Sequence, residues 1–208
     1  MSQETVTVTV HVTAEEYEAL MAHFKEAVTQ AIVTHNIPLV RSTIKLHPGL
    51  LDEAYGDPES RSNFAHMVAM HGCHELVPLI QEQRPELLQG RNRHNNTPFS
   101  LAVAGHDEET ALAFCAVDDG CAARGNIFNS NVLHIAAQHG TDKLIQVIAQ
   151  KYPNMLDEPN DLGRTPLEAA RFWNRSSAVA TLESLLPEAE VERGEPRLRL
   201  VGGQKFAR

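Results

Sequence analysis

The residues that come closest to a chemical site by type and spacing form one short cluster: His66, His71, Cys73 and His74. Imidazole nitrogens and thiolates are preferred zinc ligands, and a closed zinc site holds four ligands tetrahedrally at ~2.0 to 2.3 Å. A metal-binding or enzymatic protein that uses the cluster around His71 is therefore one hypothesis. It is the alternative hypothesis, because the chain has no second cysteine pair and no His-Glu-x-x-His motif to complete such a site.

Repetition explains these histidines with fewer assumptions, since His134 and His139 repeat the five-residue spacing of His66 and His71. Neither a phosphate-binding loop of the GxxxxGK[ST] type nor a GxSxG nucleophile elbow is present. Scattered serine, histidine and aspartate residues cannot be assembled into a triad from sequence alone, because geometry defines the triad. We therefore expect no enzyme, no catalytic residue, no metal site and no cofactor.

The repetition extends well beyond the histidines. Four similar blocks occupy residues 63–69, 97–102, 131–137 and 165–170, and their fourth positions are His66, Ser100, His134 and Glu168. Successive fourth positions are 34 residues apart. A fixed period of this length is typical of proteins built from stacked repeats.

Each repeat has the pattern of a helix hairpin. Every block begins with Asn or Thr, which caps helix N-termini, and two blocks continue with Pro at the first helical position. We expect the glycines that follow, Gly72, Gly105 and Gly140, to end the first helix in a left-handed conformation. Apolar residues at helical spacing then predict a second helix with one buried face. Between hairpins, polar stretches at 91–96, 125–130 and 160–164 predict projecting loops.

The four blocks resemble the Thr-Pro-Leu-His-x-Ala signature of the ankyrin-repeat family. The resemblance to this family covers roughly residues 36–187. Two repeats depart from the signature, with Phe64 in place of Pro and Ser100 in place of His. The second repeat also shows its second helix displaced by one residue. Small residues on the first helices let neighbouring repeats approach closely, which predicts a concave side.

The expected fold is an all-α ankyrin-repeat solenoid of four to five helix hairpins with an extra N-terminal helix. The expected divisions are an N-terminal strand and capping helix at 1–35, repeats at 36–187 and a tail at 188–208. We expect residues 13–34 to form the extra helix, with a capping box at Thr13 and Glu16, and residues 37–51 to form one helix. Alternating apolar residues at 6–12 and 197–201 predict two short strands that pair with each other, as a terminal strand pair, or with the sheet edge of a partner. Two frayed termini are the alternative.

Composition narrows the class of protein. Hydrophobic residues make up 42% of the 208 residues and the net charge is -9, so we expect a globular protein that does not bind nucleic acid. No apolar run is long enough to cross a membrane, and no secretion signal begins the chain. Three irregularly spaced cysteines fit a reducing compartment, so we expect a cytoplasmic protein.

The resemblance implies that another protein binds on the loop tips and on the last turn of each first helix. Through the repeat register, these positions are Met70, His71, Arg93, His94, Asn96, Ile127, Phe128, Gln138, His139, Leu162, Arg164, Phe172 and Trp173. Aromatic residues, Met and Arg are enriched in protein interfaces, so Phe128, Arg164 and Trp173 are the expected anchors. The alternative for Phe172 and Trp173 is packing against the C-terminal segment.

The expected function is therefore an adaptor or scaffold that binds a protein partner reversibly. A bacterial effector translocated into a host cell is a special case of this function. The residues identify neither the partner nor the oligomeric state.

Overall fold

The computed structural model describes residues 13–105, 107–118, 126 and 128–186. These residues form α-helices and short 3-10 helices, with one isolated bridge between Tyr55 and Ser62 and no strand among them. The all-α class is confirmed. In the part of the chain so described, no helix combines the length and apolarity needed to cross a membrane. The expected strands at 6–12 and 197–201 and the expected tail at 188–208 lie outside the described residues.

The chain divides into two compact units, residues 1–53 and 54–208. The first unit contains α1 (Ala14–Val33), α2 (Ile37–Leu46) and the 3-10 helix η1 (Pro48–Asp52). The predicted capping box is present, because Thr13 Oγ1 accepts from the Glu16 amide at 3.2 Å and Glu16 Oε2 accepts from the Thr13 amide at 2.8 Å.

The expected single helix over residues 37–51 is wrong. Pro48 disfavours a helical conformation at His47, whose φ and ψ are -132° and 73°, so α2 ends and the chain turns into η1. The same break recurs in the second unit, where η4 (Pro85–Gln89) and η5 (Pro153–Leu156) follow Arg84 and Tyr152. These three prolines therefore mark a repeated turn after the second helix.

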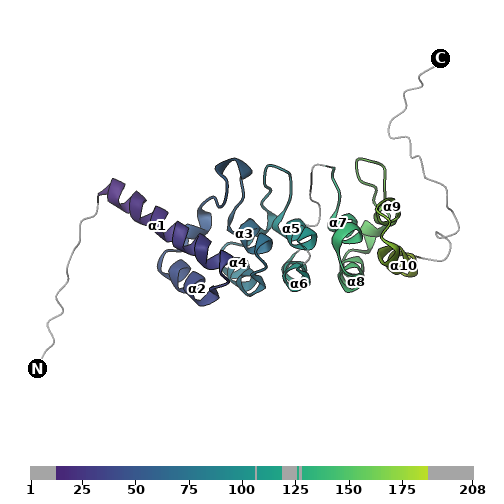
Figure 1. Cartoon of the computed structure of the whole chain (residues 1–208), viewed down its shortest axis with the longest axis horizontal. Coiled ribbons are helices and arrows are strands. Elements are labelled where there is room, and N and C mark those ends of the chain that lie inside the picture. Colours follow the sequence, from purple (N-terminus) through teal and green to yellow (C-terminus); the bar gives the residue numbers. More distant parts are fainter. Residues whose placement is uncertain (1–12, 106, 119–125, 127, 187–208) are drawn as a thin grey trace, which may run out of the picture. The chain divides into compact units, whose positions relative to one another are not determined.

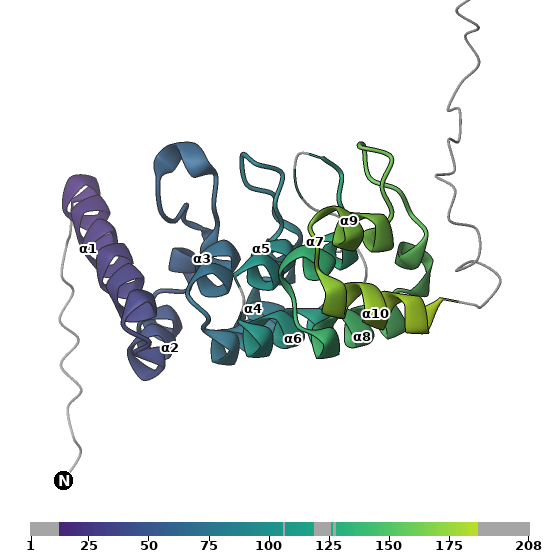
Figure 2. The ribbon, with the colours of Figure 1, turned by 45° about the vertical axis from the view of Figure 1, so that its right-hand side comes forward.

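The second unit consists of two rows of short helices (Figures 1 and 2). One row contains the first helix of each hairpin: α3 (Phe64–Met70), α5 (Pro98–Ala104), α7 (Val132–His139) and α9 (Pro166–Phe172). The other contains the second helices: α4 (Val77–Gln83), preceded by η3 (His74–Leu76), then α6 (Glu108–Val117), α8 (Asp142–Lys151) and α10 (Ser176–Leu185). Each helix packs on the next member of its own row, and the apolar core lies between the rows.

Capping residues start the first row of helices as the sequence predicts. Asn63, Thr97, Asn131 and Thr165 have extended backbones, and each side-chain oxygen accepts from the amide three residues later. The repeated Asn or Thr thereby satisfies backbone donors that a short helix leaves open.

The second row keeps a strict 34-residue register, so the expected displacement of α6 by one residue is wrong. The buried residues of α6 lie 34 residues before the buried residues of α8. In α6 they are Thr110, Ala111, Phe114 and Cys115, and in α8 they are Leu144, Ile145, Ile148 and Ala149. Thr110 fills the position that Leu76 and Leu144 occupy in the neighbouring repeats, and the sequence therefore suggested Leu112 as the counterpart of these leucines.

The expected left-handed glycine is found only at Gly72, with φ of 69°. Gly105 and Gly140 have φ of -76° and -80°, so the expectation is wrong for both. Gly140 is needed for space instead, because a Cβ atom there would lie 2.8 Å from the Ala136 carbonyl oxygen. In the fourth repeat Asn174 takes the left-handed conformation, with φ of 55°.

Candidate functional site

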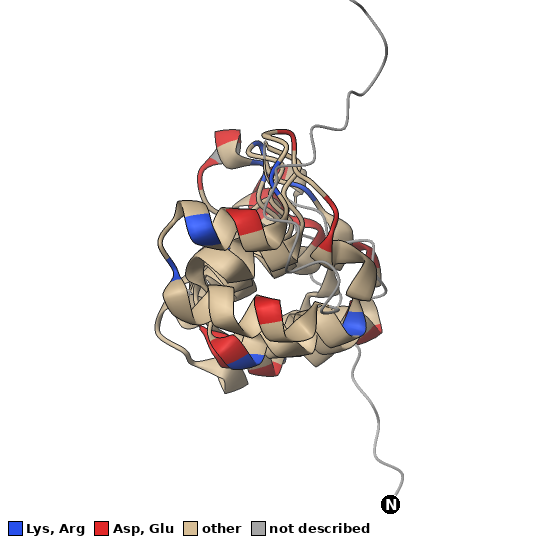
Figure 3. Cartoon of the chain, turned by 90° about the vertical axis from the view of Figure 1, so that its right-hand side faces the viewer, with Lys and Arg blue, Asp and Glu red and all other residues tan. Residues whose placement is uncertain are grey.

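The loops that precede the first helices all project from the same side of the row that these helices form (Figure 1). They carry both acidic and basic residues (Figure 3). Three of them are organised by an asparagine that recurs every 34 residues: Asn92, Asn126 and Asn160. Each Oδ1 accepts from two backbone amides, two and four residues further on, at 2.9 to 3.2 Å. Sequence analysis missed this role, although the repeated Asn was a visible signal for it.

Backbone hydrogen bonds also join each loop to its neighbour. The Arg93 amide donates to the Ser60 carbonyl at 2.9 Å, and the Asp161 amide donates to the Phe128 carbonyl at 3.0 Å. Between them, Asn126 and Asn95 are bonded through a backbone amide at 3.0 Å and a side-chain amide at 3.1 Å. The loops therefore form a connected row rather than four independent projections.

Two buried histidines attach this row of loops to the helices. His66 Nε2 donates to the Asn96 carbonyl at 3.0 Å, and His134 Nε2 donates to the Arg164 carbonyl at 2.7 Å. Because a carbonyl oxygen only accepts, Nε2 must carry the proton in both rings. Desolvation by burial lowers the pKa of both histidines, although the bonded carbonyls act in the opposite direction. Both rings therefore favour the neutral form.

Ser100 replaces this histidine in the second repeat and does not reach the next loop. Its hydroxyl donates to the Thr97 carbonyl at 2.8 Å and accepts from the Thr97 amide at 2.9 Å. The departure from the repeat pattern thus affects one loop attachment and leaves the helix cap intact.

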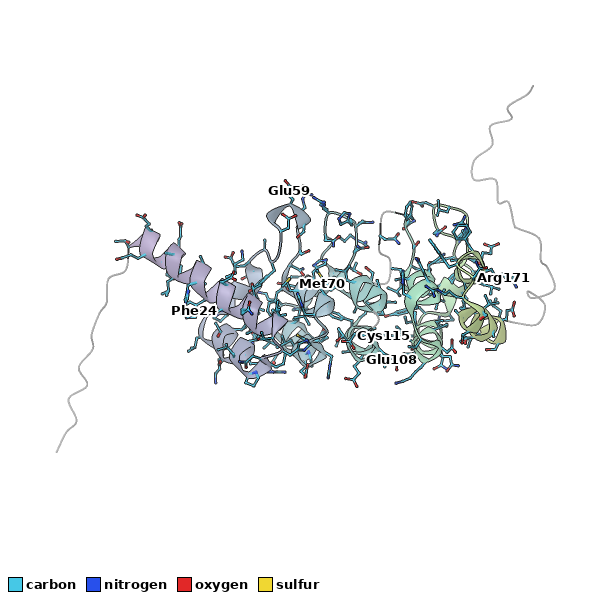
Figure 4. The ribbon with its side chains drawn as sticks, viewed as in Figure 1. Phe24, Glu59, Met70, Glu108, Cys115 and Arg171 are labelled. Atoms are coloured by element: carbon cyan, nitrogen blue, oxygen red, sulfur yellow. The ribbon has the colours of Figure 1, made fainter. Side chains whose placement is uncertain are left out.

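Six of the expected binding residues lie at the ends of first helices, and four of them belong to the first and third repeats. Met70 ends α3 and is 59% exposed (Figure 4), and His71 follows it, half-buried. Gln138 and His139 end α7 and are also half-buried.

Three more lie in the loop at 91–96. Arg93 and His94 are exposed, and the Arg93 guanidinium is paired with Glu59 of the preceding loop at 3.2 Å (Figure 4). Asn96 is half-buried, and its backbone carbonyl accepts from His66. Ile127 lies outside the described residues.

The most concentrated part of the expected site lies at the fourth repeat. The Arg164 guanidinium carbon lies 3.7 Å from the centre of the Phe172 ring, and Phe172 meets Trp173 edge to face with ring centres 5.2 Å apart. Leu162 lies in the same loop as Arg164 and is 53% exposed, and Phe128 lies in the neighbouring loop and is 47% exposed. Arg164 makes no ion pair within the described part of the chain.

Phe172 and Trp173 are 53% and 49% exposed, so neither belongs to the core. The exposed apolar residues of this region, together with the Arg164 side chain stacked on Phe172, are called the aromatic cluster below: Phe128, Leu162, Arg164, Phe172 and Trp173.

The histidine and cysteine residues around His71 do not converge. Among the described residues, no group of three or more His, Cys, Asp or Glu side chains is arranged to hold a metal ion. Both His66 nitrogens already have partners, and His74 faces Glu75 and Glu109 at 3.6 and 3.7 Å. Burial raises the pKa of Cys73 to about 11, which favours the thiol over the metal-binding thiolate.

Comparison with known proteins identifies no relative: neither a protein-family model nor a curated protein matches this sequence.

Proposed function

We propose that this chain is an ankyrin-repeat protein that binds another protein through its loop tips and the ends of its first helices. The 34-residue period, the capped helix hairpins and the histidines that reach the next loop support the ankyrin assignment. The proposed location is cytoplasmic, and the proposed role is an adaptor or scaffold without catalytic activity.

The distribution of exposed apolar residues carries the proposal. In the described part of residues 54–208, the exposed large hydrophobic residues are Met70, Phe128, Leu162, Phe172 and Trp173. Every one lies on a loop or at the end of a first helix, and none lies on the second helices. Exposed apolar residues that gather on one surface mark interaction sites, whereas scattered ones carry no such meaning.

The aromatic cluster is the proposed centre of this surface. Trp, Tyr and Arg most often dominate interface energies, particularly where a rigid scaffold holds them. Here the Arg164 backbone is held on both sides, by the His134 bond to its carbonyl and by the Asn160 bond to its amide at 3.1 Å. A partner would therefore meet a preorganised group rather than a loose side chain.

An affinity capture from cell extract followed by mass spectrometry tests the proposal. The wild-type chain is compared with a Phe128→Ser, Arg164→Glu double variant that circular dichroism shows to be folded. A Lys45→Glu, Leu46→Ser double variant is the matched control, because it makes the same kinds of change, basic to acidic and apolar to polar, at exposed positions outside the proposed surface.

We expect one protein to be captured by the wild type and the control and lost by the Phe128→Ser, Arg164→Glu variant. Capture by all three would show that this surface is not the binding site. Absence of any specific protein would remove the support for a binding function.

A further inference from the structure

The N-terminal half of α1 extends beyond the helix that covers the other half. α1 has 20 residues and α2 has 10, which correspond to lengths of about 30 and 15 Å. The residues that α1 buries are Val28, Ala31 and Ile32, all in its second half, whereas residues 14–20 are all exposed. Within residues 13–53 the first turns of α1 therefore lack helical cover (Figure 1).

This uncovered half nevertheless carries an apolar stripe. Tyr17, Leu20, Met21 and Phe24 follow the i, i+3, i+4, i+7 spacing of one helix face, which continues into the buried Val28. Tyr17 and Leu20 are 57% and 43% exposed, and Phe24 marks the edge of the covered half by stacking on His47 at 4.1 Å (Figure 4). An apolar stripe on an uncovered helix is what a partner helix would bury.

The charges beside the stripe indicate which partner fits. Glu16 and His23 are seven residues apart and therefore lie on one flank of the stripe. Glu18 and Lys25, also seven apart, lie on the opposite flank. Each flank thus has its acid toward the N-terminus and its base toward the C-terminus.

We propose that α1 pairs antiparallel with α1 of a second copy of this chain. A two-fold axis beside Leu20 and Met21 places Leu20 of one copy level with Met21 of the other, and Tyr17 level with Phe24. In such a pair each flank meets the same flank of the second copy. Glu18 then lies within about 3 Å, along the helix axis, of the level of Lys25, and Glu16 has the same relation to His23.

Charge complementarity selects this arrangement. A parallel pair would bring acid against acid at the start of the helix, and like charges on facing flanks oppose pairing. An antiparallel pair places Glu18 opposite Lys25 on one flank and Glu16 opposite His23 on the other, where histidine adds a positive charge only when it is protonated. Because about four turns of helix bury a small area, the association is weak and depends on protein concentration. It is independent of the proposed binding function, since it uses none of the same residues.

Sedimentation equilibrium of the full chain tests self-association, from about 10 µM to about 1 mM because weak interfaces populate in this range. We expect the weight-average mass to rise from the 23.0 kDa of one chain toward twice that value. Leu20→Glu is expected to keep the mass at 23.0 kDa. Leu46→Glu is the matched control, because Leu46 is 74% exposed on α2 outside the stripe, and it should associate like the wild type.

Charge reversal tests the antiparallel orientation. Glu18→Lys and Lys25→Glu should each raise the dimer dissociation constant about tenfold, because symmetry repeats every altered contact, and the double variant should restore it. Lys25 also pairs with Glu53 at 3.6 Å within its own chain, so Glu53→Gln controls for the loss of that contact.

A constant mass of 23.0 kDa over the whole range would overturn the proposal, as would equal association of the Leu20→Glu variant. Failure of the double reversal to restore association would overturn the antiparallel pairing. A chain lacking residues 1–12 should still associate, and loss of association on that deletion would assign the contact to the terminus instead of α1.

Discussion

His134 Nε2 lies 2.7 Å from the backbone carbonyl oxygen of Arg164, thirty residues away. This hydrogen bond joins the buried start of α7 to the loop that carries the basic residue of the aromatic cluster. The position of a surface group thus depends on a core histidine, so a change at His134 should affect both the stability of the fold and the binding surface.

Replacing His134 with Ala should lower the free energy of unfolding by about 2 to 3 kcal/mol. The change removes one of the two donors to the Arg164 carbonyl, the other being the Asn160 amide at 2.9 Å, and creates a cavity beneath the loop. Urea denaturation measures the loss, and His94→Ala, at an exposed loop position, should change stability by less than about 0.5 kcal/mol. Equal losses for the two variants would contradict the structural role of His134.

Stability should fall as the pH drops below about 6.5, the ordinary pKa of histidine. Burial lowers the pKa of His66 and His134 in the folded chain. Above pH 6.5 both states are neutral and the stability is complete. Below it the unfolded chain binds protons first, so the free energy of unfolding decreases until the pH passes the folded pKa values.

Urea titrations at pH 7 and pH 5 measure this decrease. A His66→Gln, His134→Gln variant, which can still donate through its amides, should lose less stability between these pH values than the wild type. A decrease of the same size in both proteins would assign the effect to other groups.

Asn160→Ala should loosen the loop before α9, because Asn160 Oδ1 accepts from the amides of Leu162 and Arg164 at 3.0 and 3.1 Å. We expect a loss of about 1 to 2 kcal/mol and faster hydrogen exchange at both amides. Asn160→Asp keeps the accepting oxygen and should keep most of the protection. If both variants exchange like the wild type, the repeated Asn does not organise the loop.

Gly140→Ala should destabilise the chain by about 1 to 3 kcal/mol, since the new methyl would meet the Ala136 carbonyl oxygen at 2.8 Å. Gly49→Ala is the control, because its Cβ would meet nothing within 4 Å and the substitution restricts the unfolded chain. Thermal unfolding compares the two variants. A neutral Gly140→Ala would show that the turn after α7 has room to adjust.

Trp173 is the single tryptophan of the chain and is 49% exposed, so its fluorescence should be accessible to iodide and acrylamide. Contact with the partner should shift the emission to shorter wavelength and reduce quenching. Blue, quencher-shielded emission in the free protein would instead favour packing against the C-terminal segment and remove Trp173 from the proposed surface.

The sequence by itself determined the all-α class and the helix hairpins. The first helices are capped by hydrogen bonds between residues three positions apart in the sequence, so residue type and order are enough to predict them. The capping residues are Asn63, Thr97, Asn131 and Thr165. The repeat period also located loop and helix-end positions, because equal spacing places equivalent residues in equivalent environments.

Tertiary structure decided the features that depend on neighbours distant in sequence. The register of α6 depends on the small Thr110 filling a core position, and the need for Gly140 comes from the close approach of Ala136 rather than from a left-handed turn. The stacking of Arg164 on Phe172 likewise joins a loop to a helix end. Such contacts arise when the chain packs, so residue type and spacing alone do not specify them.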